Sequence, residues 1–177
     1  MSLLLPPKVN IKKHWAAFEL PFAIGSGRSF FPDKSGEQAL RMAFFKSIID
    51  DSLEGKVWFG KGIEGPPLHV HGGVSSYVLD EAMGSAGWLK NYPCVAQSIS
   101  FQFLKMTPIG KDLDIRAHVK NIKGRILSIE CEIYDKQGPY TQGSGEFFWL
   151  HREKVEQLLE KSPILGLDLD TLNFAKN

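Results

Sequence analysis

The chain has 177 residues, 43% of them hydrophobic, which is enough to bury one core but short for two full domains. Its 21 lysines and arginines nearly balance 20 aspartates and glutamates, and the net charge of +1 excludes a global basic field that would attract nucleic acid or an anionic membrane. No stretch approaches the ~20 apolar residues of a membrane-spanning helix.

The cysteines and the first residues both favour a cytoplasmic protein. Cys94 and Cys131 lie far apart and form no Cys-x-x-Cys pair, a pattern typical of reduced thiols. The apolar run at residues 3–5 is too short for a signal peptide. Residues 1–36 carry neither a helix-turn-helix pattern nor a basic stripe. We therefore expect a cytoplasmic location, no nucleic-acid partner and no membrane insertion.

The first third of the chain predicts an arm followed by two strands. Residues 1–36 mix aromatic side chains with proline and glycine, which suits an arm that lies over a core and includes a short helix near residues 9–20. Two apolar clusters within residues 40–59 are separated by turn-forming residues at 50–52 and 54–55. This pattern predicts two strands joined by a turn.

One long helix is predicted after an exposed loop at residues 60–67. Residues 70–90 contain no proline and place apolar side chains at helical spacing. Interior glycine costs roughly 1 kcal/mol relative to alanine, so glycines on one helical face indicate that another backbone passes close by. Such a face, of small and polar residues, consists of Gly73, Ser76, Asp80, Gly84 and Gly87.

Alternating apolar and polar residues then predict an antiparallel meander with one wet face. The alternating runs are residues 98–103, 113–120, 127–133 and 141–150, and a helical pattern follows at 151–161. The predicted fold is α+β, with a curved antiparallel sheet of about six strands wrapped around one long central helix. The expected division is an arm at 1–36, a domain at 37–150, and a helix with a tail at 151–177.

Two short motifs carry a family resemblance. Residues 65–73, Gly-Pro-Pro-Leu-His-Val-His-Gly-Gly, are followed by Val-Leu-Asp-Glu-Ala-Met-Gly at residues 78–84. They resemble the signature of the phenylacetic-acid-type (PaaI-like) hotdog thioesterases, and the likeness extends over about residues 38–150. The resemblance implies an acyl-CoA thioesterase that needs no cofactor. It also implies a homodimer or a dimer of dimers, with active sites at the subunit interface.

The resemblance assigns roles to three residues. The acidic residue that matches Asp80 either activates water or attacks the thioester, and the N–H at the position of Gly72 polarises the thioester carbonyl. A hydroxyl that assists in some relatives matches Ser98. Several relatives carry an asparagine shortly before His-Gly-Gly, where this chain has Gly65-Pro66-Pro67. That duty falls to a histidine or a backbone group, or is absent.

The residues themselves support the same chemistry. Thioester hydrolysis needs a donor for the oxyanion and a base or nucleophile, and a helix that begins at Gly72 and Gly73 offers N–H groups without side-chain clash. Alternatively, these glycines only begin a tightly packed helix. Asp80 is a poor helix former within an apolar helix, so it is either catalytic or a residue that caps backbone or reaches solvent. Glu81 points about 100° away and is interpreted as structural or interfacial.

The histidines and serine have weaker signals. His69 and His71 alternate as in a strand, but no third ligand follows at a convincing spacing, so no metal site is predicted. His71 is expected to fix the loop by hydrogen bonding or to orient substrate. Ser98 and His118 lie on polar faces of their strands, where an ordinary solvated side chain is the preferred interpretation for both, so a catalytic role for Ser98 rests on the resemblance.

Substrate contacts and rival functions complete the expectations. The candidate substrate-binding residues are His69, Tyr77, Lys90, Lys105 and Arg125, the last three for CoA phosphates. Aromatic side chains that line either an acyl pocket or the core are Tyr77, Trp88, Phe101 and Phe103. The rivals are a non-catalytic acyl-CoA-binding hotdog module and a hotdog enoyl-CoA hydratase or dehydratase. An obligate dimer is expected to form through the helix and residues 99–104.

Overall fold

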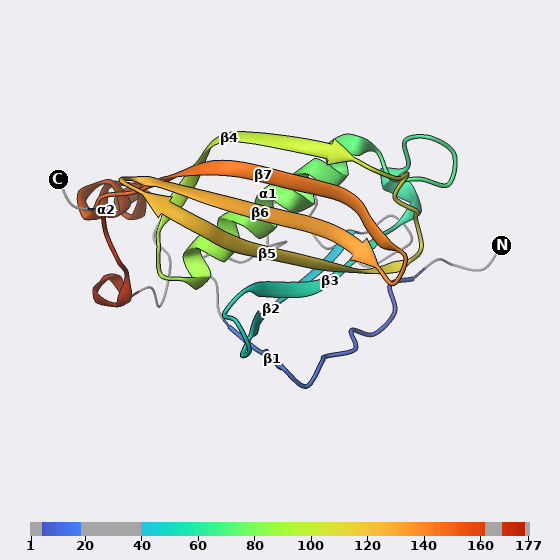
Figure 1. Ribbon diagram of the computed structural model, residues 1–177, viewed down its shortest axis with the longest axis horizontal. Helices are drawn as coiled ribbons and strands as arrows, with labels where there is room; N and C mark the ends of the chain where they lie inside the picture. The colour runs from blue at the N-terminus through green and yellow to red at the C-terminus, as the bar shows by residue number, and fades with distance from the viewer. Residues whose placement is uncertain (1–4, 19–39, 162–167, 176–177) are drawn as a thin grey trace.

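A computed structural model describes residues 5–18, 40–161 and 168–175 (Figure 1). The strands are β1 (Trp15–Ala16), β2 (Leu40–Ser47), β3 (Leu53–Phe59), β4 (Cys94–Phe103), β5 (Asp112–Lys123), β6 (Ile126–Asp135) and β7 (Gly138–Trp149). The helices are α1 (Gly72–Leu89), α2 (Arg152–Lys161) and the short 3-10 turns η1 (Lys61–Ile63) and η2 (Leu169–Thr171). The order confirms the prediction that one long helix follows two strands and precedes four more.

All strands belong to one seven-stranded antiparallel sheet in the order β1-β2-β3-β5-β6-β7-β4. The helix α1 packs along one face of this sheet (Figure 1). Because β4 is an edge strand of ten residues, one long row of its backbone groups has no strand partner among the described residues. The predicted α+β architecture is confirmed, with β1 as an additional short strand.

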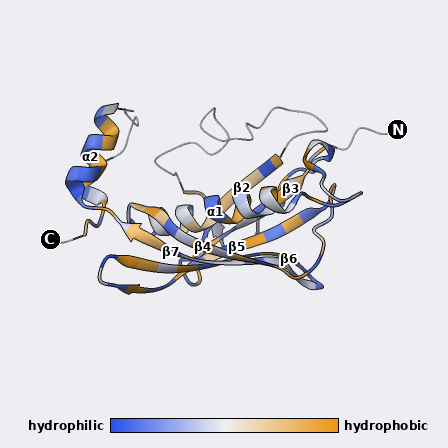
Figure 2. Cartoon of the chain, turned by 90° about the horizontal axis from the view of Figure 1, so that it is seen from above, coloured by the Kyte–Doolittle hydropathy of each residue, from blue (hydrophilic) through white to orange (hydrophobic). Residues whose placement is uncertain are grey.

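The core lies between α1 and the inner face of the sheet. In β6, Leu127, Ile129 and Ile133 are buried against the helix, while Glu130 and Glu132 point to the outer face. The same alternation appears as bands of hydrophobic and hydrophilic residues along β5 (Figure 2). The period of two in the sequence therefore separates an apolar face that meets the helix from a polar face on the outside.

The N-terminal arm differs from its prediction. Within the described part of residues 9–20 there is no helix, and Trp15–Ala16 instead pairs with the end of β2 as strand β1. The indole Nε1 of Trp15 donates to Glu54 at 2.7 Å, and its ring stacks on Phe45 at 5.0 Å between centroids. Tertiary pairing and burial of one tryptophan therefore override the local helical spacing.

The turn between β2 and β3 is also shorter than predicted. Residues 54–55 were expected to form part of the turn, but they lie inside β3, where Gly55 pairs with Phe44. A side chain at Gly55 would overlap the carbonyl oxygen of Ala43. This glycine therefore marks a close approach of two strands and not a turn.

The glycines of α1 do not confirm the predicted close approach of another backbone. A Cβ at Gly87 would overlap the sulfur of Cys94, whereas a Cβ at Gly84 would meet only Phe147, at an ordinary 4.0 Å. At Gly87 the nearest atom belongs to a side chain, while the backbone oxygen of Tyr92 lies 3.5 Å from the added Cβ. The close neighbour is thus mainly a thiol at the start of β4.

The C-terminal helix is confirmed, and it stands apart at one end of the sheet (Figure 2). The following described segment returns to the sheet, because the indole of Trp149 donates to the carbonyl of Asn173 at 2.8 Å and Ala175 is buried. No described helix is long and apolar enough to cross a membrane. The division into an arm, a domain and a tail stays a prediction.

Candidate active site

The loop that precedes α1 sets the direction in which the helix begins. The N–H of Val70 donates to the carbonyl of Thr107 at 2.8 Å, and the N–H of His71 donates to Ile63 at 3.0 Å. A Cβ at Gly65 would lie 2.8 Å from the Cα of His71, so only glycine fits there. This contact explains why residue 65 is a glycine, in the Gly65-Pro66-Pro67 stretch that stands where several of the resembling proteins carry an asparagine.

The first turn of α1 leaves one backbone donor unused. The N–H of Gly73 donates to Nδ1 of His71 at 3.1 Å, while the N–H groups of Val74 and Ser75 both donate to the carbonyl of His71 at 2.9 and 3.3 Å. Among the described residues, no acceptor is recorded for the N–H of Gly72. A helix N-terminus carries a partial positive charge, so this N–H is suited to bind a developing oxyanion.

These contacts refine the predicted roles of two residues. His71 is the N-cap of α1, and its ring fixes the first turn as the sequence suggested. Because Nδ1 accepts a hydrogen bond, the lone pair on that nitrogen is available and any proton of the neutral ring resides on Nε2. The N–H of Gly73 is already occupied, so of the two predicted donors only Gly72 is open to a ligand.

Packing does not require glycine at position 72. A Cβ there would meet only the ring of Phe103, at an ordinary contact distance of 3.4 Å. At Gly73, by contrast, a Cβ would lie 3.2 Å from Nδ1 of His71, which is a tight contact. The fold therefore tolerates a larger residue at position 72, where an added Cβ would touch only the Phe103 ring.

Asp80 lies half-buried on α1 with no recorded hydrogen bond or ion pair to another described residue. Burial raises the pKa of its carboxyl group above the ordinary value. Burial also raises the pKa of Glu81, the charge of Asp80 raises it further, and a hydrogen bond with Tyr77 opposes these effects. Among the described residues, Asp80 is thus a carboxylate without a partner and with an elevated pKa, a combination that suits a general base.

Gly72 and Asp80 of one chain are too far apart to act on one carbonyl group. They are separated by eight residues of continuous helix, which corresponds to about 12 Å along the axis. A reacting carbon needs both groups within roughly 3 Å. The described chain therefore supplies an oxyanion donor and a carboxylate but does not bring them together.

Ser98 is placed on the other side of the sheet from α1. It borders a shallow depression on the outer face that is also lined by Lys120, Ser128 and Glu146. The structure therefore does not bring Ser98 together with Asp80 of the same chain. A β-bulge near Ala96 shifts the register just before this residue.

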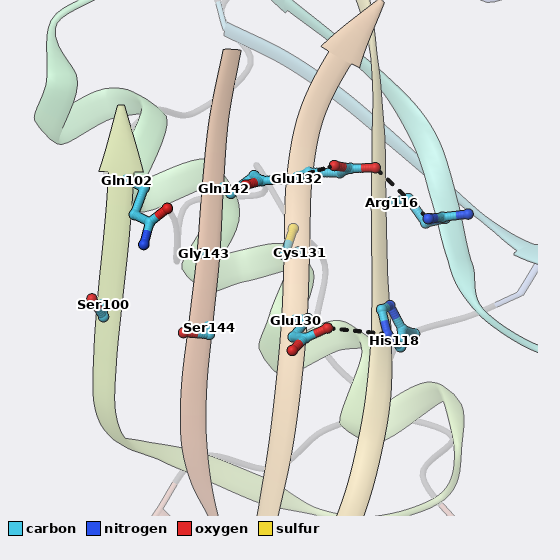
Figure 3. Close-up of a pocket in the computed structure, with 10 residues that line it drawn as sticks. All are labelled: Ser100, Gln102, Arg116, His118, Glu130, Cys131, Glu132, Gln142, Gly143 and Ser144. Carbon is cyan, nitrogen blue, oxygen red and sulfur yellow. Dashed lines mark hydrogen bonds and ion pairs between the residues drawn. The ribbon is translucent and has the colours of Figure 1, made fainter. Parts of the chain in front are cut away.

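A second depression on the outer face is polar and charged (Figure 3). There His118 lies 3.6 Å from Glu130, and Arg116 lies 3.7 Å from Glu132, which in turn accepts a hydrogen bond from Gln142. The expectation of an exposed His118 agrees with its half-exposed side chain. These residues face away from α1, so they belong to a surface separate from the Gly72 region.

The remaining predicted residues divide between the two ends of α1. Lys105 lies just past the end of β4, near the helix start, and its ammonium donates to the carbonyl of Gln137 at 2.6 Å. Lys90 caps the far end of the helix, and Arg125 stacks on Phe148 in the hairpin between β5 and β6. The structure thus places the three predicted phosphate ligands in separate parts of the fold, with the ammonium of Lys105 held at the turn between β6 and β7.

The ring of His69 hydrogen-bonds to its own loop, with Nδ1 2.8 Å from the carbonyl of Pro67. Tyr77 is half-buried one helical turn before Glu81, with which it shares a hydrogen bond. No group of three or more His, Cys, Asp or Glu side chains is arranged to hold a metal ion within the described ranges.

Comparisons with known proteins agree with this geometry. The family model of the Thioesterase superfamily matches residues 69–141, which run from the end of the loop before α1 through β4–β6 to the start of β7. The human acyl-coenzyme A thioesterase THEM5 is 27% identical over 106 residues, which cover 59% of this chain and 40% of that protein. The chain therefore spans well under two thirds of this relative.

Solved structures share the fold. A protein of the thioesterase superfamily superimposes with a TM-score of 0.58 at 26% identity, covering 60% of this chain and 53% of the other. The PaaI protein of the E. coli phenylacetic acid degradation operon gives 0.55 at 17% identity, covering 63% and 79%. The architecture is thus that of a hotdog domain. Over residues 69–141 the chain resembles the Thioesterase superfamily, whose model matches that stretch.

Sequence reasoning missed the contact between Phe103 and Gly72. The alternation in β4 placed Phe103 on the face shared by Ile99 and Phe101, but it did not show that the strand ends beside the first turn of α1. Pairing across the sheet determines where β4 ends relative to the helix, and no local pattern encodes that position.

Proposed function

We propose that this protein hydrolyses acyl-CoA thioesters to a carboxylic acid and CoA. The observation that carries the proposal is the N–H of Gly72, which begins α1 and has no acceptor among the described residues. The similarity to a human acyl-coenzyme A thioesterase supports the same substrate class.

Two groups carry the reaction. The thioester carbonyl oxygen accepts a hydrogen bond from the N–H of Gly72, which stabilises the negative charge that develops as the carbonyl carbon is attacked. The carboxylate of Asp80 removes a proton from the attacking water, or it attacks the carbon itself to give an anhydride that water then cleaves. The C–S bond breaks, and CoA leaves as a thiolate with a thiol pKa of about 8.5, so no strong acid is needed.

We further propose that each site is built from two copies of the chain. Because Gly72 and Asp80 are about 12 Å apart along one helix, a complete site needs the carboxylate of a second copy. Two α1 helices that lie side by side in opposite directions bring Asp80 of each copy to Gly72 of the other. Pairing along the free edge of β4 gives such a dimer a continuous sheet.

The test is the pair Asp80→Asn and Glu81→Gln, assayed as kcat and KM on folded protein. Asp80→Asn removes the charge at constant size, so kcat should fall by ~10²–10⁴-fold with little change in KM. Glu81→Gln removes the neighbouring carboxylate and serves as the matched control, with kcat within about threefold of wild type. Near-normal turnover by folded Asp80→Asn would exclude the catalytic assignment.

Mixing tests the shared site. Asp80→Asn and Gly72→Asp variants, each inactive alone, should regain activity when unfolded together and refolded as mixed dimers, since one of the two sites is then intact. No recovery in mixed dimers of verified composition would contradict a site built from two chains.

A further inference from the structure

The ring of Phe103 stands beside the proposed oxyanion donor. At the end of β4, which lies by the first turn of α1 (Figure 1), its Cε1 and Cζ atoms are 3.4 Å from the position of a Cβ at Gly72. The residue is nevertheless 57% exposed. An aromatic side chain with most of its surface open therefore borders the space in front of the free N–H.

Exposed apolar side chains continue from this ring. Leu104 is 48% exposed and Met106 is 60% exposed, and these two residues with Phe103 are called the apolar rim. The hydrogen bond from Val70 to Thr107 ties the segment that follows to the loop entering α1. Isolated exposed apolar residues are ordinary, but this group borders both the β4 edge of the proposed dimer and the N–H of Gly72, so it is suited to contact a ligand bound between two copies.

From this placement we propose that Phe103 is a specificity residue that contacts the acyl group of the substrate, and that the enzyme selects apolar acyl groups over small or charged ones. The inference rests on the proposed hydrolase function. The inference adds the class of acyl group that the enzyme prefers, and it names the side chain that contacts this group.

The chemistry of the two halves of the thioester decides which half lies on Phe103. With the carbonyl oxygen at Gly72, one neighbour of the carbonyl carbon is the pantetheine sulfur and the other is the acyl chain. Pantetheine carries amides, and each amide left without a hydrogen bond on an aromatic surface costs about 1–3 kcal/mol. An alkyl or aryl chain instead gains about 0.8 kcal/mol for each buried CH₂ group.

The expected effect is a change in the preference between esters and not a uniform loss of activity. One buried CH₂ group corresponds to about a fourfold change in kcat/KM. Wild type should therefore prefer octanoyl-CoA over acetyl-CoA by at least tenfold, and it should disfavour succinyl-CoA, whose carboxylate would lie near the ring.

The experiment measures kcat/KM for acetyl-, octanoyl-, phenylacetyl- and succinyl-CoA with wild type, Phe103→Ala, Phe103→Leu and Ile122→Ala. Phe103→Ala should lower the octanoyl-to-acetyl ratio about tenfold, and Phe103→Leu should lower the phenylacetyl-to-octanoyl ratio. Ile122 is 39% exposed on β5, away from the β4 edge, so Ile122→Ala is the control for loss of an exposed apolar side chain and should leave both ratios unchanged. Sedimentation of each variant checks that assembly is retained.

Binding of two thioethers separates this inference from the hydrolase proposal. Calorimetry should show that S-octyl-CoA binds wild type more tightly than S-ethyl-CoA, and Phe103→Ala should remove that difference. If no ester is hydrolysed but this contrast holds, the hydrolase proposal fails and the role of Phe103 stands. If esters are hydrolysed and both Phe103 variants keep the wild-type ratios, or wild type prefers acetyl- or succinyl-CoA, the inference is wrong. If Phe103→Ala folds poorly, the ratios measured for Phe103→Leu decide whether the inference holds.

Discussion

The two ends of α1 both carry glycine, for different physical reasons. At the C-terminal end, a Cβ on Gly87 would overlap the sulfur of Cys94, and the last carbonyls are used by the N–H groups of Lys90, Asn91 and Tyr92. At the N-terminal end, a Cβ on Gly72 would meet one ring at an ordinary distance, and its N–H has no recorded acceptor in the described chain.

This contrast separates a glycine that packing requires from one that packing merely permits. The C-terminal end is closed by a thiol and by backbone hydrogen bonds, so a change there should act on stability. The N-terminal end is open, so a change there should act on the reaction. Position in the helix alone does not distinguish the two residues, because both glycines belong to the same continuous element.

The largest expected effect on stability is that of Gly87→Ala. Because the added methyl overlaps the sulfur of Cys94, overpacking should cost about 1–3 kcal/mol of unfolding free energy, measured by urea denaturation. Adding Cys94→Ala should recover part of this loss in a double-mutant cycle. Turnover per folded molecule should stay within about threefold of wild type. An unchanged unfolding free energy would show that the end of the helix is looser than the contact implies.

Gly72→Ala should give the opposite result. Its methyl crowds the space beside the N–H but clashes with nothing, so kcat should fall about tenfold to a hundredfold while Tm stays at or slightly above the wild-type value. The measurement pairs steady-state kinetics with calorimetric melting. Full activity in Gly72→Ala would remove the reason to place the thioester carbonyl at this position.

His71→Ala should have a smaller effect on both quantities. The variant loses the side-chain acceptor for the N–H of Gly73, and loss of an N-cap costs typically ~1 kcal/mol. The N–H of Gly72 remains, so kcat should fall less than in Gly72→Ala. His71→Asn supplies another good capping side chain and should restore most of the unfolding free energy. Equal stability of the alanine and asparagine variants would contradict the capping role.

The smallest expected effect is a gain in Tm for Asp80→Asn. Burial raises the pKa of Asp80, so folding disfavours its ionised form. That penalty is fully present above the folded-state pKa and disappears below the unfolded value of about 3.9. Asp80→Asn should therefore melt a few degrees higher than wild type at pH 7, and the difference should vanish as the pH falls toward 4.

The same shift gives the pH dependence of the reaction. Since Asp80 must be ionised to act, kcat/KM should decline as the pH falls through a pKa above the ordinary aspartate value. Glu81→Gln removes a neighbouring titrating group and is the control for that profile. If Glu81→Gln abolished the decline at low pH, the titrating group would be Glu81 and the assignment to Asp80 would be wrong.

Local patterns predicted the elements that depend on periodicity. The start of α1 at Gly72 and the four strands of the meander are confirmed, because glycine pairs and alternating residues act over a few positions. The strand at Trp15–Ala16 and the inclusion of Gly55 in β3 were not predicted, since both result from pairing with β2. Local propensity could not foresee those long-range contacts.

The candidate site shows the same division. The sequence singled out Gly72, Asp80 and His71 from the types of residue that the chemistry needs, and the structure gives the first an unused N–H and the last a capping role. The sequence did not reveal that Gly73 is already hydrogen-bonded, or that Ser98 lies on the outer face. Those facts depend on one ring torsion and on the register of an edge strand.

The chain's two thiols make its proposed chemistry easy to follow in the test tube. Cys94 and Cys131 are the only cysteines, and both are buried and unpaired. Burial raises the pKa of Cys94 to about 12 and raises that of Cys131 as well, so neither forms appreciable thiolate near neutral pH. A dye that reacts with thiolates will therefore label released CoA while the native enzyme stays colourless, and slow labelling of the protein itself will report unfolding.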